Sequence, residues 1–195
     1  MIARFAVALA GAFALLAATS QSPLDGTWSL EPGGSAGMVN IQFRSTDASA
    51  KEDFQSAFDV SAQELGISAT QLASQNGDVA FTWAREAGSF ACRGRLSGGK
   101  GGGTFAFTPS PEYLSKMRAA GYDLTSPRDQ MVAAILDIST VYVAAIAAAG
   151  YPHLPFHTLI AFRALRIDDA YVRAMRAAFG AAGLTPDEVI SLQAL

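Results

Sequence analysis

Two histidines are the residues of this chain best suited to bind a metal ion. His153 and His157 are four positions apart, and on one helix this spacing would place both imidazoles on the same face, as a zinc site requires. Pro155 lies between them, however, so His153 is predicted to precede the helix that carries His157. No nearby carboxylate supplies a third ligand. We interpret both as turn or surface histidines and predict neither a metal site nor a cofactor.

Cys92 is the only cysteine, which excludes an internal disulfide and leaves one thiol that could act as a nucleophile. A nucleophilic thiol needs a base and positive surroundings, and Arg93 and Arg95 are close in sequence. In a strand, those arginines point to the opposite face from Cys92. Because Cys92 shares its face with Phe90, we predict a buried thiol that behaves as a small apolar side chain.

Three further patterns that could indicate an active site have a structural explanation. No serine lies in a Gly-x-Ser-x-Gly elbow. The glycine-rich residues 98–103 lack the Ser or Thr of a phosphate loop and lead into a strand, so they are interpreted as a flexible hairpin connection. Asp168 and Asp169 resemble a metal-binding pair, but Asp168 is at a repeated helix-capping position. We therefore predict no catalytic residues.

The second half of the chain contains a tandem repeat. Tyr113, Tyr142 and Tyr171 follow one another at intervals of 29 residues. Each tyrosine is preceded at three positions by a capping residue, namely Ser110, Ser139 and Asp168. Each is followed at four positions by an apolar residue, namely Met117, Ile146 and Met175. A capping residue followed by apolar residues at helical spacing predicts a helix start, and prolines near 127, 155 and 186 predict a second helix in each unit. A period of this length is typical of stacked helix–turn–helix units, which we place at 110–138, 139–167 and 168–195.

The first half is predicted to form a small antiparallel sheet. Apolar residues alternate along four segments between Gly26 and Phe107, namely 39–43, 79–83, 90–92 and 105–107. Gly94 lies inside one of them and indicates a bulge or a close backbone approach. Residues 51–76 differ in pattern and are predicted to form short helical turns, with a capping box from Ser61 to Glu64. The expected fold is α+β, with a sheet domain at 21–109 and helical repeats at 110–195.

The N-terminus is typical of an export signal. Arg4 is followed by an apolar run of about 14 residues and by small residues at a cleavage site near Ser20, which is short for a membrane span. We predict a signal peptide at 1–20 and an exported protein, periplasmic or extracellular, with a retained anchor as the alternative. A net charge of −3 without a basic stripe argues against nucleic acid and anionic membrane partners. The apolar segment 131–150 is interrupted by Asp137 and is interpreted as the central repeat unit rather than a membrane helix.

The second half resembles a known type of repeat. Residues 171–176, with the sequence Tyr-Val-Arg-Ala-Met-Arg, and residues 150–154, with the sequence Gly-Tyr-Pro-His-Leu, carry the likeness. They are similar to repeats of uncharacterised exported bacterial proteins and of the extracytoplasmic parts of antirepressor-type sensor peptidases. Residues 26–28 and 105–107 resemble the β-rich region that precedes those repeats. The resemblance implies a fold and no catalytic residues, since the chain has no His-Glu-x-x-His.

These patterns favour an exported, non-catalytic binding protein. Its partner is expected to be a protein or peptide of the cell envelope, with a role as an accessory to an envelope sensor. The expected contact residues are the arginines of the repeat helices, which could equally form a solvated face: Arg128, Arg163, Arg166, Arg173 and Arg176. One alternative is a carrier of a small hydrophobic ligand that uses the sheet, which a hydrophobic cavity between the sheet and the first repeat helix would favour. A hydrolase of unknown type is the least favoured alternative.

Overall fold

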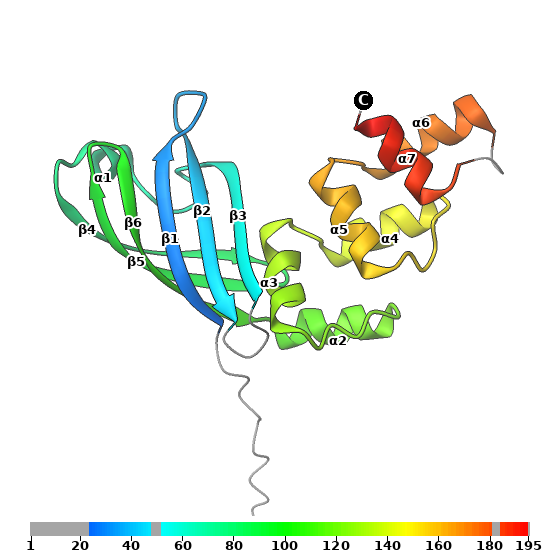
Figure 1. Ribbon diagram of the computed structural model, residues 1–195, viewed down its shortest axis with the longest axis horizontal. Helices are drawn as coiled ribbons and strands as arrows, with labels where there is room; N and C mark the ends of the chain where they lie inside the picture. Colours follow the sequence, from blue (N-terminus) through cyan, green and yellow to red (C-terminus); the bar gives the residue numbers. More distant parts are fainter. Residues whose placement is uncertain (1–23, 48–51, 181–183, 195) are drawn as a thin grey trace, which may run out of the picture.

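The computed structural model describes residues 24–47, 52–180 and 184–194. A six-stranded antiparallel sheet comes first and six short helices follow it, so the predicted α+β class is confirmed (Figure 1). The predicted signal peptide lies outside the described residues.

The sheet pairs the first strand of the chain with the last. Its strands are β1 (Leu24–Pro32), β2 (Met38–Asp47), β3 (Glu52–Ser61), β4 (Gly77–Arg85), β5 (Gly88–Ser97) and β6 (Lys100–Pro109). Their order in the sheet is β3-β2-β1-β6-β5-β4. The register places Trp28 of β1 opposite Phe43 of β2 and Gly103 of β6. The two edges of the sheet are therefore β3 and β4.

The prediction of short helical turns across 51–76 was wrong for its first part. Residues 52–61 form strand β3, in which Phe54, Phe58 and Val60 point alternately into the protein interior. Only α1 (Ala69–Ala73) is helical, and its capping box is formed by Ser68 and Gln71. Ser61 does accept a hydrogen bond from the Glu64 amide at 3.3 Å, but this bond closes a turn. The period-two apolar pattern within β3 was the stronger signal.

The glycine-rich segment was also predicted wrongly, because most of it belongs to strand β6. Only Gly98 and Gly99 form the turn, with φ of 57° and 80°. The glycines of β6 allow close approach to β5, because a Cβ on Gly101 would lie 2.4 Å from Leu96 Cδ2. The indole of Trp28 donates from Nε1 to the Arg93 carbonyl of β5 at 3.3 Å.

Gly94 marks a close backbone approach, one of the two interpretations of this residue. It pairs with Gly103 across β5 and β6. A Cβ on Gly103 would lie 2.6 Å from the Cα of Gly94, and a Cβ on Gly94 would overlap the Gly102 carbonyl oxygen. Side chains on this pair would therefore force the two strands apart.

Aromatic rings fill the buried face of the sheet. Phe43, Trp83 and Phe90 form its centre, with ring centroids 4.8 Å apart for Phe43 and Phe90 and 5.3 Å apart for Trp83 and Phe90. Phe105 and Phe107 extend the cluster along β6. Such offset and tilted aromatic contacts add to the stabilisation from apolar burial.

The helices follow the sheet in three pairs. They are α2 (Pro111–Ala119), α3 (Pro127–Ile135), α4 (Thr140–Ala148), α5 (Phe156–Ala164), α6 (Asp169–Phe179) and α7 (Pro186–Gln193). The predicted capping residues start the first helix of each pair: Ser110, Ser139 and Asp168 accept from the amides of Tyr113, Tyr142 and Tyr171. Each of these bonds satisfies an amide that the helix itself leaves without a partner.

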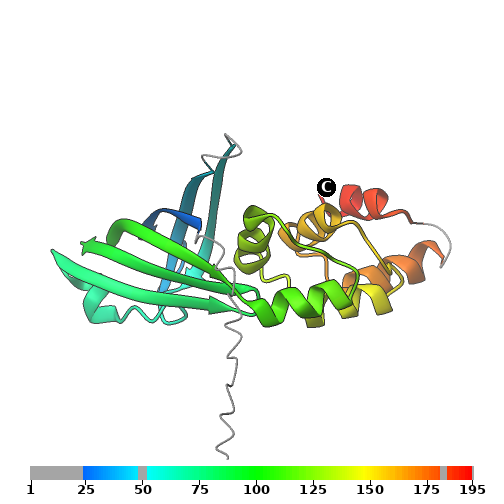
Figure 2. The same ribbon diagram turned by 90° about the horizontal axis from the view of Figure 1, so that it is seen from below.

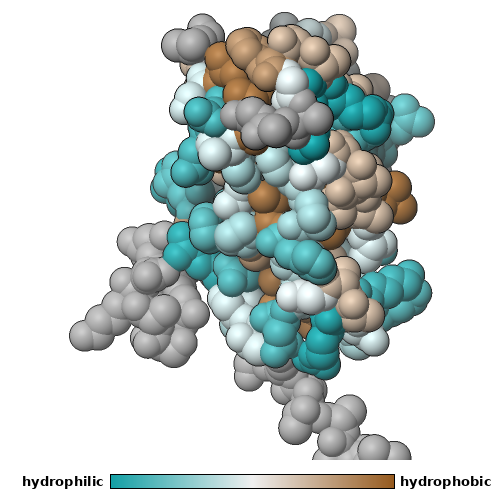
Figure 3. All heavy atoms as spheres, turned by 90° about the vertical axis from the view of Figure 1, so that its right-hand side faces the viewer, coloured by the Kyte–Doolittle hydropathy of each residue, from teal (hydrophilic) through white to brown (hydrophobic). Residues whose placement is uncertain are grey.

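The helix pairs extend from one end of the sheet. In Figure 2, α2, α4 and α6 follow one another along one side, and α3, α5 and α7 along the other. Helix α3 contacts β4, β5 and β6 and thereby joins the repeats to the sheet. Figure 3 views the far end of this row, where apolar and polar residues both reach the surface.

The apolar segment 131–150 is divided between two helices. Helices α3 and α4 together have the length and composition of a membrane span, but they are bent by 80° at the break between them. No single helix of the described chain is long and apolar enough to cross a membrane. Met131, Tyr142 and Ile146 are buried in the protein core.

Candidate functional site

The repeated tyrosines hold the segment that leads from each helix pair into the next. The Tyr113 hydroxyl donates to the Ile138 carbonyl at 2.7 Å, and the Tyr142 hydroxyl donates to the Ile167 carbonyl at 2.8 Å. Ile138 and Ile167 stand directly before the capping residues of α4 and α6. We call such a contact, at the point where one helix pair leads into the next, a joint. The interval between the tyrosines is thus the interval between successive joints.

A second set of hydrogen bonds joins the second helix of each unit to the preceding unit. Arg163 Nε donates to the Leu136 carbonyl at 2.9 Å, and Gln193 Nε2 donates to the Leu165 carbonyl at 3.2 Å. Leu136 and Leu165 cap the C-termini of α3 and α5. A carbonyl that a helix end leaves without an intrahelical donor is therefore satisfied by the following unit.

Two of the arginines expected to contact a partner belong to these joints. Arg163 also pairs with Asp137 at 2.9 Å and lies 4.9 Å from the Tyr142 ring centroid. Arg176 donates to the Gly150 carbonyl at 3.2 Å and lies over the ring of Tyr151. The sequence could not distinguish such arginines from surface ones, because their acceptors lie one unit away.

The remaining three arginines lie in different places. Arg128 is exposed in the first turn of α3, and Arg173 pairs with Asp169 on the surface of α6. Arg166 is exposed in the turn after α5 and has a φ of 57°. Arg163 and Arg166 line the same cavity.

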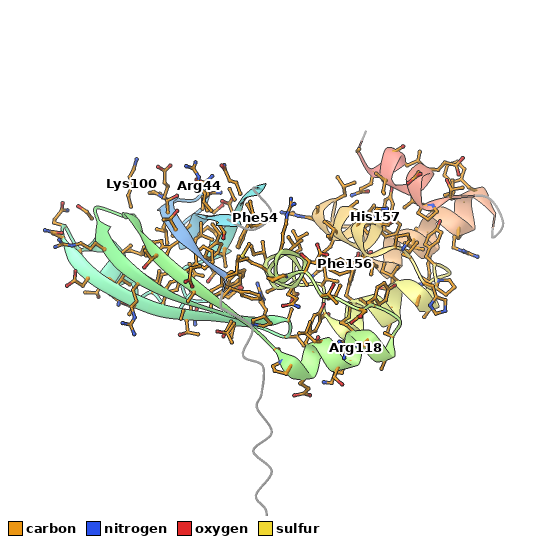
Figure 4. The ribbon with its side chains drawn as sticks, turned by 60° about the horizontal axis from the view of Figure 1, so that its bottom comes forward. Arg44, Phe54, Lys100, Arg118, Phe156 and His157 are labelled. Carbon is orange, nitrogen blue, oxygen red and sulfur yellow. The ribbon has the colours of Figure 1, made fainter. Side chains whose placement is uncertain are left out.

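That cavity is a cleft of about 700 Å³ between the sheet and the repeats, which we call the β3 cleft. Its sheet wall is formed by Ser56, Ala57 and Phe58 of β3 and by Arg85 at the end of β4. Its helical wall consists of residues 135–137 after α3 and of residues 163, 164, 166 and 168 after and within α5. Figure 4 shows Phe54 of the same strand on the side of the sheet that faces the helices, and Phe156 and His157 on α5.

The β3 cleft combines an open strand edge with charged groups of both signs. Among the described strands, β3 pairs with β2 only, so its other edge has main-chain groups available for a further strand. Arg85 forms an ion pair with Glu64 and lies 4.9 Å from the Trp83 ring centroid. Within the described residues, Arg166 forms no ion pair. These features suit the binding of an extended peptide.

Neither histidine takes part in a metal site of the described chain. His153 lies in the turn before α5 with a φ of 59°, whereas His157 lies within α5, and both are exposed. Within residues 24–47, 52–180 and 184–194, no three histidine, cysteine, aspartate or glutamate residues are grouped to hold a metal ion.

Cys92 lies on the buried face of the sheet, as the alternation of apolar residues along its strand predicted. It is 1 % exposed, while Arg93 and Arg95 point to the outer face. Burial disfavours the thiolate and raises the pKa of Cys92 to about 12. A nucleophilic cysteine requires the opposite shift.

Cys92 is therefore expected to resist a thiol reagent in the folded protein. At pH 8 the native protein should react with a maleimide far more slowly than the protein in denaturant, since both access and ionisation are suppressed. Mass spectrometry of the modified fraction with time measures this difference. Rapid labelling of the native protein, with its thermal transition unchanged, would show that the thiol is accessible.

Glu86 connects the sheet to the repeats and was not singled out in the sequence. It lies in the turn between β4 and β5, and its carboxylate accepts from the Thr140 amide at 2.8 Å and from the Thr140 hydroxyl at 2.6 Å. A carboxylate at the first turn of a helix also complements the positive end of the helix dipole. The partners are far apart in the chain, so no local pattern reveals the contact.

No protein-family model, curated protein or solved structure matches this chain.

Proposed function

We propose that this chain is a non-catalytic binding protein that holds an extended segment of a protein partner in the β3 cleft. The observation that carries the proposal is the position of the open edge of β3, which forms one wall of a cleft whose other wall carries Arg163 and Arg166. An added strand could hydrogen-bond along β3 through its main chain, and its side chains would face the helical wall.

The charges of the cleft favour a segment that contains an acidic side chain. Arg85 and Arg163 are already paired with Glu64 and Asp137. Arg166 is exposed and forms no ion pair within the described chain, so it is the cation best placed to meet an incoming carboxylate. From the signal-like N-terminus and the resemblance of the repeats, we place this partner in the cell envelope, in the vicinity of a sensor.

The test is photo-crosslinking from the strand edge in the producing cell. A photoreactive amino acid at position 57, where Ala57 is exposed on β3, should capture a protein partner. The same amino acid at Thr82, exposed on the opposite edge strand β4, is the matched control and should capture little. Mass spectrometry of the crosslinked peptide would identify the captured segment.

A charge reversal then distinguishes specific capture from chance contact. Arg166→Glu should reduce the crosslinked yield from position 57 by at least about tenfold if a carboxylate is bound there, which corresponds to roughly 1.4 kcal/mol. Arg173→Glu, on the exposed face of α6, should leave the yield unchanged. Equal yields from positions 57 and 82, or no effect of Arg166→Glu, would refute the proposal.

A second candidate function rests on a different cavity. An apolar pocket of about 630 Å³ lies between the β1–β2 turn, the end of β3 and α1, and is lined among others by Met38, Ile67 and Leu72. This pocket could hold a small hydrophobic ligand, although it does not lie beside the first repeat helix, the position expected to favour a carrier. Native mass spectrometry of the purified protein should reveal a copurifying small molecule if this function is correct.

A further inference from the structure

The junction between the second and third units is closed by an arginine and a tyrosine. Arg176 Nη1 donates to the Gly150 carbonyl at 3.2 Å, and its guanidinium lies 5.9 Å from the Tyr151 ring centroid. The Tyr151 hydroxyl donates to the Leu184 carbonyl at 2.7 Å. A cation that lies over an aromatic ring and donates to a main-chain carbonyl therefore helps to hold these two units together.

The junction between the first and second units lacks both contacts. Its glycine and tyrosine are Gly121 and Tyr122, which stand 29 positions before those of the second junction. The position equivalent to Arg176 is occupied by Ala147. Within the part of the chain that the structure describes, the Tyr122 hydroxyl forms no hydrogen bond. The first junction therefore has the surface that receives a cation at the second junction, but no cation of its own there.

Two neighbouring cavities lie at this first junction. The larger has a volume of about 370 Å³ and is lined by Gly121 and Tyr122. The smaller, of about 230 Å³, is mostly apolar and is lined by Tyr122, Ala147 and Val143. His153 lines both cavities. We call the two cavities together the open junction. Their size suits a small molecule, and they share no lining residue with the β3 cleft.

The charges of the larger cavity favour a cation. Asp129, in the first turn of α3, lines this cavity, is half-buried and forms no ion pair within the described residues. Asp123 lines it too, but is paired with Arg118 at 3.0 Å. The starts of α3 and α5 each contribute about half an elementary positive charge and the end of α2 about half a negative one, so Asp129 keeps the cavity negative. Phe156 adds a second aromatic ring, with its centroid 6.5 Å from that of Tyr122.

We propose that the open junction binds a small organic cation that carries a guanidinium group on an alkyl chain. The guanidinium would lie over the Tyr122 ring and donate to the Gly121 carbonyl, as Arg176 does at the second junction. The Asp129 carboxylate would balance its charge. The alkyl chain would lie in the smaller cavity, where Ala147 leaves the space that an arginine side chain would fill. This site is separate from the β3 cleft, so it can exist whether or not a peptide binds there.

Butylguanidinium is the probe, and butylurea, which has a similar shape and no charge, is its matched control. Nuclear magnetic resonance titration of the isotope-labelled protein should move the amide signals of residues 120–129 and 153–156. Because the ligand has few atoms, we expect a dissociation constant on the order of 1 mM. Butylurea should bind at least about tenfold more weakly, since it cannot pair with Asp129 or interact as a cation with the rings.

Ala147→Arg supplies the missing cation within the chain. Its side chain should occupy the open junction as Arg176 occupies the second junction, so the affinity for butylguanidinium should fall by at least about tenfold. Ala148→Arg, the control, adds the same side chain at the next position of α4, which is exposed and lines neither cavity. It should leave the affinity unchanged. Circular dichroism would verify that both variants fold.

A second pair of variants tests the carboxylate. Asp129→Asn should weaken binding by about tenfold, because it removes the charge and keeps the size of the side chain. Asp187→Asn, in the first turn of α7, should have no effect. Equal binding of butylguanidinium and butylurea, an effect of Asp129→Asn no larger than that of its control, or undiminished binding to folded Ala147→Arg would overturn the proposal. So would shifts confined to the pocket of Ile67 and Leu72. The comparison of the two probes on the unaltered protein holds even if a variant fails to fold.

Discussion

Replacing Phe90 by alanine is expected to lower the free energy of unfolding by about 3–5 kcal/mol. Phe90 is fully buried, and its ring lies within 4.8 Å of the ring centroids of both Phe43 and Phe107. Truncation removes apolar contact with both halves of the sheet and leaves a cavity among rigid rings, which cannot close around it.

Urea unfolding followed by tryptophan fluorescence measures this loss, because Trp83 packs on Phe90 and reports on the same cluster. Val141→Ala is the control, since a side chain that is 77 % exposed should change the stability by no more than about 0.5 kcal/mol. A loss below about 1 kcal/mol for Phe90→Ala would contradict the aromatic core described here.

The double substitution of Tyr113 and Tyr142 by phenylalanine is expected to have the next largest effect. Each change keeps the ring but leaves a main-chain carbonyl, of Ile138 or Ile167, without its donor. A buried polar group left without a partner costs about 1–3 kcal/mol. The two joints involve different residues, so the losses should add to about 2–6 kcal/mol.

Tyr171→Phe is the matched control within the same repeat. Its hydroxyl donates to no carbonyl of the described residues, so its removal should change the stability by at most about 0.5 kcal/mol. Thermal unfolding of Tyr113→Phe, Tyr142→Phe, the double variant and Tyr171→Phe, at low protein concentration, measures these changes in stability. If Tyr171→Phe were as destabilising as Tyr113→Phe, the hydrogen bonds of the tyrosine hydroxyls would not explain the cost.

The tyrosine joints also predict a loss of stability at high pH. Burial, with a smaller contribution from Asp168, raises the pKa of Tyr142 to about 12 despite the nearby Arg163. Unfolded tyrosine has a pKa of about 10. Because the folded pKa is the higher one, the stabilisation is complete below pH 10 and is lost as the pH rises towards 12. Tyrosinate absorbance and circular dichroism should therefore change together in this range.

Local signals predicted the helices better than the sheet. The caps at Ser110, Ser139 and Asp168 were predictable because a capping residue and the amide that donates to it lie three positions apart. Strand β3 was missed because turn residues and a capping-box sequence surround its apolar alternation. The glycine-rich segment forms a strand by pairing with β5, whose atoms leave no space for a Cβ on Gly101 or Gly103.

The candidate site was beyond local reasoning for the same physical reason. The interval between the tyrosines was visible in the sequence. Their acceptors are the main-chain carbonyls of Ile138 and Ile167, and every residue has such a carbonyl, so the residue type does not identify an acceptor. The β3 cleft forms only when the edge of the sheet meets the ends of α3 and α5. The arginines were selected by residue type alone. Only their neighbours in the fold show that Arg163 is hydrogen-bonded and paired within the protein, whereas Arg166 is exposed.

Because the joints repeat the same contacts, this architecture can be built with different numbers of units. Each uses the same pair of contacts to main-chain carbonyls: a tyrosine hydroxyl donates to the last residue of its own unit, and a second-helix side chain donates to the preceding unit. Descendants of such a gene can therefore gain or lose a whole period while every remaining joint keeps its chemistry. A change of one residue within a period would misalign both contacts at once, so inheritance should preserve the period more strictly than the number of units.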